Sequence, residues 1–138
     1  DDKLQTYKFL LEKIELFRDI INARFRFKEM TIDKRKGFLF HFGEKEIGPD
    51  QLSSGEQHEL VITYDLLFQV EHGSLVMVDE PEISLHVAWQ QQFISDVRRI
   101  ARLTGIRFII ATHSPQIIHT WHDRAIALSS KARRGGSR

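Results

Sequence analysis

The chain of 138 residues has the length of one domain, and its 20 Lys and Arg against 19 Asp and Glu give no preference for a nucleic-acid or membrane partner. It has no cysteine, which excludes disulfides and thiolate metal sites and fits a reducing, cytoplasmic compartment. No apolar run approaches the ~20 residues that span a bilayer, and no signal-peptide pattern is present, so we expect no membrane partner.

Apolar residues near the beginning of the chain recur at steps of three and four, which predicts an amphipathic helix from about Lys3 to Asn22. The apolar stripe is formed by Leu4, Tyr7, Leu10, Leu11, Ile14, Phe17 and Ile21. A packed helix is favoured over a coiled coil because the stripe is too short to establish heptads. We treat residues 1–23 as this helix.

Two β-prone runs follow the helix, Phe25–Ile32 and Phe38–Phe42, with Gly37 in the turn between them. This pattern predicts a small β-hairpin. The segment has a local excess of positive charge from Arg24, Arg26, Lys28, Lys34, Arg35 and Lys36. We interpret these residues as the solvated, charged edge of the hairpin, with a DNA-facing ridge as the alternative.

The next helix is predicted over Glu56–Val70, with Ser53-Ser54-Gly55 at its amino end. Leu75–Glu80 starts as a short apolar run and ends in two carboxylates, and Pro81 stops it. Such a run indicates a central parallel strand that is buried on both faces. Its acids would then lie at the carboxyl end of a core strand, where open α/β sheets bind their ligands.

Helix and strand signals alternate downstream of this strand. The expected elements are a helix over Val87–Leu103, a strand over Arg107–Thr112, a short helix from Pro115 to about residue 120, and a strand over Ala125–Leu128. Together with the strand that precedes them, this order predicts a parallel α/β sheet with right-handed crossovers.

Three motifs, in this order and with these separations, resemble the C-terminal half of an ABC-type ATPase head. They are Leu52–Gln57 for the signature, Leu75–Glu80 for Walker B and Ala111–Pro115 for the switch-histidine loop. The resemblance covers roughly residues 37–128. It implies a P-loop NTPase-like partial domain, mainly a parallel sheet flanked by helices, which we place at 24–130, before a disordered basic tail at 131–138.

The resemblance implies ATP and Mg²⁺ as cofactors and gives each motif a role. Asp79 would bind the metal ion, Glu80 would orient the attacking water, and His113 would hydrogen-bond the γ-phosphate. The residues that would face the nucleotide of a second copy, in a head-to-tail homodimer, are Ser53, Ser54, Gly55 and Gln57 in the signature and Ser84 in the D-loop. Ser54 departs from the Gly that is usual at its position.

Each motif also has a plain structural interpretation. Two acids that end a strand are common, Ser53 to Glu56 is by itself a capping box, and His113 alone could be a capping or core histidine. For Glu82 and His86, surface or interface packing is at least as good an interpretation as chemistry. The order of the three motifs favours the ATPase interpretation.

The run Pro81–His86 resembles the repair, chromosome-maintenance and phage-defence branch of these ATPases, including the overcoming-lysogenisation-defect proteins, more than it resembles transporter ATPases. This resemblance implies a DNA or nuclease partner. In the ATPases of chromosome maintenance and repair, a coiled-coil arm enters the head just before the signature. The helix at residues 1–23 could be the end of such an arm.

No Gly-x-x-x-x-Gly-Lys-Ser/Thr loop is present in the sequence, so nothing in it would cradle the β- and γ-phosphates. The chain begins Asp1-Asp2-Lys3 without an initiator methionine, which we interpret as a fragment whose phosphate loop lies upstream. We therefore expect that the chain alone does not hydrolyse ATP and that its intact parent does. The alternative is a non-catalytic dimerisation or interaction module that keeps the ABC-like fold and uses Leu4–Ile21 as its partner helix.

Overall fold

The computed structural model describes residues 1–119 and 121–128. Its helices are α1 (Asp2–Arg24), α2 (Ser54–Tyr64), α3 (Val87–Thr104) and α4 (Pro115–Ile118). Its strands are β1 (Lys28–Asp33), β2 (Gly37–Phe42), β3 (Lys45–Ile47), β4 (Leu75–Asp79) and β5 (Arg107–Ala111). Short 3₁₀ turns lie at Pro49–Gln51, Pro81–Ile83 and His122–Arg124, and a π-helix at Asp65–Gln69. The fold is therefore mixed α/β, as the sequence predicts.

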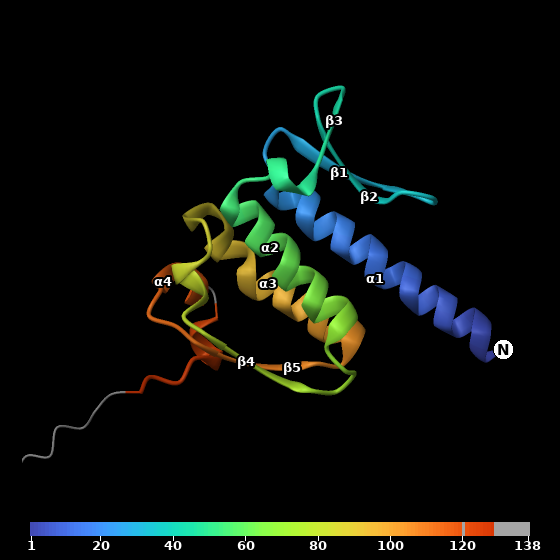
Figure 1. Ribbon diagram of the computed structural model, residues 1–138. Coiled ribbons are helices and arrows are strands. Elements are labelled where there is room, and N and C mark those ends of the chain that lie inside the picture. The colour runs from blue at the N-terminus through green and yellow to red at the C-terminus, as the bar shows by residue number, and fades with distance from the viewer. Residues whose placement is uncertain (120, 129–138) are drawn as a thin grey trace, which may run out of the picture.

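The helices α2 and α3 form the centre of the molecule (Figure 1). On one side α1 runs alongside them, with the antiparallel sheet β1–β2–β3 over it, and on the other side lies the parallel pair β4–β5. None of the described helices is both long and apolar enough to cross a membrane. The basic tail at 131–138 falls outside the described residues.

The predicted first helix is confirmed as α1, but only its second half packs as expected. Leu16, Phe17, Ile20 and Ile21 are buried, whereas Leu4, Tyr7, Leu10 and Leu11 are exposed. The first turns of α1 project beyond the other helices, so the apolar stripe there has no described element to pack against (Figure 1).

The predicted hairpin is confirmed by the antiparallel pairing of β1 with β2. Gly37 begins β2 with a φ of 82°, a value that glycine adopts without strain. The strand β3 is not expected from the sequence; it pairs with β2 and makes the sheet three-stranded. Arg24 is buried, so the prediction that it belongs to the charged edge is wrong.

The pairing of β4 with β5 is parallel, but the prediction of a mainly parallel sheet is wrong for the rest of the structure. The prediction that β4 is buried on both faces is also wrong. Leu75 and Met77 of β4 are 52% and 75% exposed, and Ile109 of β5 is 52% exposed. Among the described elements, helices cover only the opposite face of this pair, so alternate side chains of both strands face outward.

The strand predicted over Ala125–Leu128 is absent from the structure. These four residues are exposed and have no regular secondary structure. Isolated strands are not stable without neighbours to accept and donate their backbone hydrogen bonds. The apolar spacing of the segment is therefore not sufficient to make it a strand.

Two hydrophobic clusters hold the layers together. The larger cluster joins α1 to the antiparallel sheet, α2 and α3, and consists of Leu16, Phe17, Ile20, Ile21, Phe25, Met30, Phe40, Leu52, Leu67 and Ile100. The smaller cluster packs α3 against the parallel pair and α4 through Leu85, Phe93, Val97 and Ile117. Phe108 of β5 packs against both clusters. The inner face of the parallel pair is thus continuous with the core.

Arg24, the last residue of α1, is the centre of a buried charge cluster. Its guanidinium pairs with Glu59 of α2 at 3.6 Å and with Asp96 of α3, and it donates to the Trp89 carbonyl at 3.3 Å. The Trp89 indole N–H donates back to the Arg24 carbonyl at 3.2 Å. Burial raises the pKa of Glu59, and the charge of Arg24 opposes that rise. One cation therefore connects three helices.

Replacing Arg24 with Ala should lower the free energy of unfolding by about 3–5 kcal/mol, because the change leaves carboxylates buried without their cation. The matched control is Arg18→Ala on the same helix. Its ion pair with Asp19 is exposed and should contribute no more than about 1 kcal/mol. Urea unfolding followed by circular dichroism measures both variants, and equal losses would contradict the role assigned to the buried cluster.

Candidate functional site

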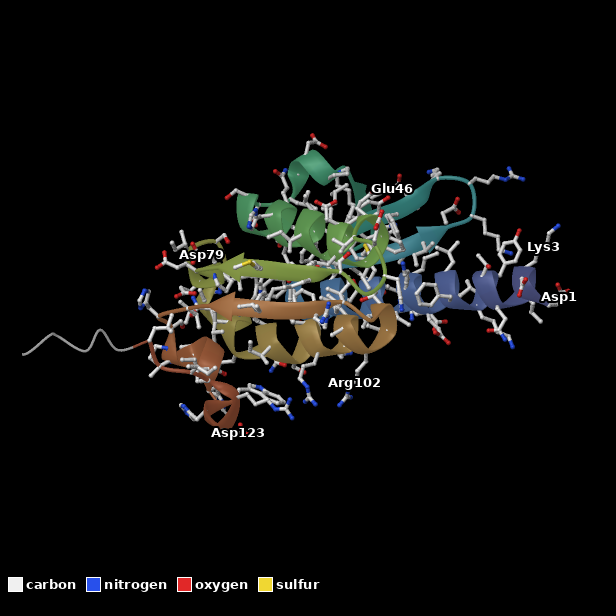
Figure 2. The ribbon with its side chains drawn as sticks, turned by 90° about the horizontal axis from the view of Figure 1, so that it is seen from below. Asp1, Lys3, Glu46, Asp79, Arg102 and Asp123 are labelled. Atoms are coloured by element: carbon white, nitrogen blue, oxygen red, sulfur yellow. The ribbon has the colours of Figure 1, made fainter. Side chains whose placement is uncertain are left out.

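The carboxyl ends of β4 and β5 lie side by side. Asp79 and Ala111 are direct partners in the parallel register, so the residues that follow each strand leave the sheet together. The Glu80 N–H donates to the Ala111 carbonyl at 2.8 Å and extends the pairing by one bond. Figure 2 shows Asp79 at this end of the strand pair. The register thus brings Asp79 and Glu80 beside the loop that follows β5, the loop predicted to carry the switch histidine.

Glu80 and His113 face each other across this end of the sheet. The Glu80 Oε1 lies 3.4 Å from His113 Nε2, and their side chains are 40% and 89% exposed. Glu80 has a φ of 45° and a ψ of 56°, the left-handed region that non-glycine residues rarely occupy. Such strain persists where the surrounding structure fixes it, and it is often found at functional sites. Both side chains are accessible to a ligand.

Glu82 holds the loop that follows β5 through two hydrogen bonds. Its Oε2 accepts a hydrogen bond from the Thr112 hydroxyl at 2.7 Å, and its Oε1 accepts one from the His113 backbone N–H at 2.8 Å. Partial burial raises the pKa of Glu82. The hydrogen bonds from Thr112 and from backbone N–H groups outweigh that effect and leave the pKa below its usual value.

A second set of hydrogen bonds anchors the same loop to α3. The Ser114 hydroxyl donates to Gln90 Oε1 at 2.7 Å, and both residues are buried. The Gln90 amide donates in turn to the carbonyls of Leu85 and Glu82, at 3.3 and 3.4 Å. The sequence gives no signal for the role of Gln90, and for Glu82 it leaves packing and chemistry both open. The one local signal for Glu82 is its place directly after Asp79, Glu80 and Pro81.

The segment predicted to be the signature forms the amino end of α2. Ser53 is the N-cap: its hydroxyl accepts from the Glu56 N–H at 3.3 Å, while Glu56 Oε2 accepts from the Ser53 N–H at 2.8 Å. Lys28 also pairs with Glu56 at 2.6 Å. Burial raises the pKa of Glu56, but these donors outweigh it and the net pKa is lowered. The predicted capping box is therefore present, which both interpretations of this segment require.

The remaining signature and D-loop residues are placed as follows. Ser54 is exposed in the first turn of α2, and Gly55 lies close to Trp89, which would be 3.9 Å from an added Cβ. Gln57 is engaged with the preceding turn, because its amide donates to the Pro49 carbonyl at 3.0 Å. Ser84 is exposed after Pro81–Ile83. The Ser84 hydroxyl donates to the Pro81 carbonyl at 3.4 Å, within the same turn.

The structure brings Glu80 and His113 together but does not bring the signature onto them. Among the described residues, no hydrogen bond or ion pair joins the Ser53–Gln57 segment to Asp79, Glu80 or His113. The amino end of α2 nevertheless lies at the same end of the molecule as the carboxyl ends of β4 and β5 (Figures 1 and 2). Within the described part of the chain, no three His, Asp or Glu residues are grouped as a metal site.

Comparisons with known proteins match the chain to ATPases and ATP-binding proteins. A family model described as "AAA domain, putative AbiEii toxin, Type IV TA system" matches residues 4–119. The chain is 32% identical over 81 residues to the "Retron Ec83 probable ATPase" of Escherichia coli, which covers 51% of this chain and 15% of that protein.

Transporter components also match. The chain is 32% identical over 81 residues to the spermidine/putrescine import ATP-binding protein PotA of Pseudomonas fluorescens, covering 59% of this chain and 21% of that protein. It is 28% identical over 76 residues to the ABC transporter ATP-binding protein YtrE of Bacillus subtilis, covering 55% and 32%. The chain thus spans less than a third of the length of each of these relatives.

The lowered pKa of Glu82 predicts how the switch-histidine loop responds to acid. A carboxylate with a depressed pKa contributes stability above its unfolded pKa, about 4.3 for Glu, and loses it as the pH falls through the lower folded value. In ¹H–¹⁵N spectra, the amide signal of His113 should therefore shift with a midpoint below about pH 4.3. This inflection should vanish in Glu82→Gln. A midpoint at or above that pH would contradict the expected effect of the hydrogen bonds.

Proposed function

The chain belongs to the AAA domain family that matches its residues 4–119, and we propose that it supplies one half of an ATP-hydrolysis site in an ABC-type ATPase head. Its relatives are ATPases and ATP-binding proteins, so an ATP-binding, ATPase-type region is the class they share. The finer assignment rests on one observation above all. The Glu80 carboxylate and the His113 imidazole meet 3.4 Å apart at the ends of two parallel strands.

In this proposal Glu80 and His113 act on the same phosphate. The Glu80 carboxylate is exposed and can accept a proton or hydrogen bond from a water aligned with the γ-phosphate. The His113 imidazole can donate a hydrogen bond to a phosphate oxygen. Hydrolysis removes that phosphate, and His113 then loses its partner. Loss of this contact is a local change that the loop could pass on to the rest of the head.

The acids at the end of β4 fit a magnesium ion. Asp79 is exposed beside Glu80, and carboxylate oxygens are ligands that Mg²⁺ prefers. Mg²⁺ usually takes only one or two carboxylates and completes its shell with phosphate and water oxygens. Asp79 therefore suffices as the protein ligand, without a cluster of three acids. The ion would neutralise charge on the phosphates, and Asp79 would hold it in place.

The signature would serve a second copy of the head. The amino end of α2 presents unpaired N–H groups and the exposed side chains of Ser53 and Ser54, which suit a phosphate. Among the described residues of one chain, no hydrogen bond or ion pair joins this segment to Glu80 or His113. We propose that Ser53, Ser54 and Gly55 face the nucleotide of a partner in a head-to-tail homodimer, with Ser84 at the interface. Gln57 would support the preceding turn through Pro49.

The branch of the family is proposed from the residues that follow the Walker B acids. Both a retron ATPase and transporter ATP-binding proteins match the chain, so similarity alone does not separate the two classes. The run Pro81–His86 favours the repair and phage-defence branch, because it differs from the usual transporter pattern. A DNA substrate or a nuclease partner would follow from that assignment.

A second function is favoured by the exposed first half of α1. Leu4, Tyr7 and Leu11 are each more than half exposed on one helix. A non-catalytic interaction module would use this surface to bind a partner and would have no need of Glu80 or His113. The ATPase assay below separates the two functions.

In a complete head that carries a phosphate-binding loop, Glu80→Gln should lower kcat for ATP hydrolysis by about 100-fold or more, because the water loses its base. The KM for ATP should stay within a few-fold, since Glu80 is not expected to bind the nucleotide. Glu71→Gln, an exposed change in the turn before β4, serves as the matched control. Equal activity of Glu80→Gln and the wild type would contradict the ATPase assignment and favour the interaction module.

The 138-residue chain by itself should show no Mg²⁺-dependent hydrolysis in a single-turnover assay with excess protein over ATP. The reason is that its sequence contains no loop able to cradle the β- and γ-phosphates. Hydrolysis by this chain that Glu80→Gln abolishes would show that the site is complete without such a loop.

A further inference from the structure

We propose that Glu82 is the positioning residue of this site, and that its carboxylate sets the place of His113 relative to Glu80. The proposal rests on the proposed function for the meaning of the Glu80–His113 pair. The hydrogen bonds on which the proposal is based do not depend on ATP. They connect the segment that follows β4 to the loop that follows β5.

The two carboxylate oxygens of Glu82 accept hydrogen bonds from two different residues of the loop. One oxygen accepts from the Thr112 hydroxyl at 2.7 Å, and the other accepts from the His113 N–H at 2.8 Å. Hydrogen bonds to an ionised acceptor are roughly twice as strong as those between neutral groups. Because the bonds reach adjacent residues, they fix both the position and the direction of the backbone from which the imidazole projects.

The imidazole has little else to hold it. The His113 side chain is 89% exposed, and its one hydrogen bond or ion pair with a side chain among the described residues is with Glu80. Residues 112–114 belong to neither a strand nor a helix. The place of the ring is therefore set by its backbone, and the Glu82 carboxylate is the charged group that holds that backbone.

The segment Glu80–Glu82 carries both acids: Glu80 contacts the His113 side chain, and Glu82 binds the His113 backbone. Glu80 precedes the buried Pro81, and Glu82 follows it in a single 3₁₀ turn. A shift of this turn would move the Glu80 carboxylate and the His113 backbone together. Glu82 therefore couples the ends of the two strands, although both of its oxygens are turned to the loop rather than to the proposed nucleotide.

The direct test uses amide hydrogen exchange of the 138-residue chain followed by NMR. In Glu82→Ala the His113 amide should exchange on the order of 10- to 100-fold faster, as expected for the loss of a hydrogen bond to a charged acceptor. Amides within β4 and β5 should keep their rates. The control Glu71→Ala should leave the His113 amide unchanged. An unchanged rate in Glu82→Ala would overturn the proposal.

A milder variant covers the case in which Glu82→Ala loosens the whole chain. Thr112→Val removes one donor to Glu82 and keeps the size of the side chain, and it also removes the acceptor of the Ser114 N–H at 3.0 Å. It should accelerate exchange at His113 by several-fold through the weakened loop, with the rest of the chain unaffected. If exchange at His113 stays the same in this variant, the proposal is wrong.

The role in catalysis is tested in the complete head by a double-mutant comparison. If Glu82 acts through His113, then Glu82→Ala lowers kcat with little change in KM, and the double variant with His113→Ala is no slower than His113→Ala alone. Independent losses that multiply would overturn the positioning role. The exchange experiment tests the positioning role of Glu82, and the Glu80→Gln assay tests the ATPase function. Either can fail without the other, because only the second needs ATP hydrolysis.

Discussion

The parallel register of β4 with β5 is the constraint on which the candidate site depends. Because Asp79 pairs with Ala111, the two acids of one motif and the histidine of another leave the sheet at the same point. No side chain of the site has to reach across the molecule. The 3.4 Å approach of Glu80 to His113 follows from this register, and the Glu82 carboxylate then fixes the loop on which His113 stands.

The helices that support the site are joined by a second polar interaction, the buried charge cluster around Arg24. Its partners Glu59 and Asp96 lie on α2 and α3, the helices that begin with the signature and directly after the Walker B turn. Removing such charges from water costs free energy that offsets much of their mutual attraction. The main effect of the cluster is therefore to fix the relative placement of three helices rather than to add net stability. A displacement of α1 would therefore act on both helices.

Much of this arrangement could be predicted from local patterns. Short apolar runs predicted β4 and β5, Gly37 predicted the hairpin turn, and the Ser53–Glu56 spacing predicted the start of α2. Burial could not be predicted in the same way. The apolar residues of Leu75–Val78 indicate a strand with two covered faces, but the described chain supplies helices for only one. The role of Glu82 could not be predicted either, because its hydrogen bonds reach residues 30 and 31 positions away in the sequence and leave no periodic pattern.

The most direct test of the central claim is a crystal structure of the complete head with Mg²⁺ and a non-hydrolysable ATP analogue. The account predicts that the γ-phosphate contacts both a water held by Glu80 and the imidazole of His113, with Asp79 on the metal ion. It also predicts the Ser53–Gly55 segment of a second copy on the far side of that phosphate. A nucleotide bound away from the ends of β4 and β5, with Glu80 and His113 not contacting it, would contradict the account.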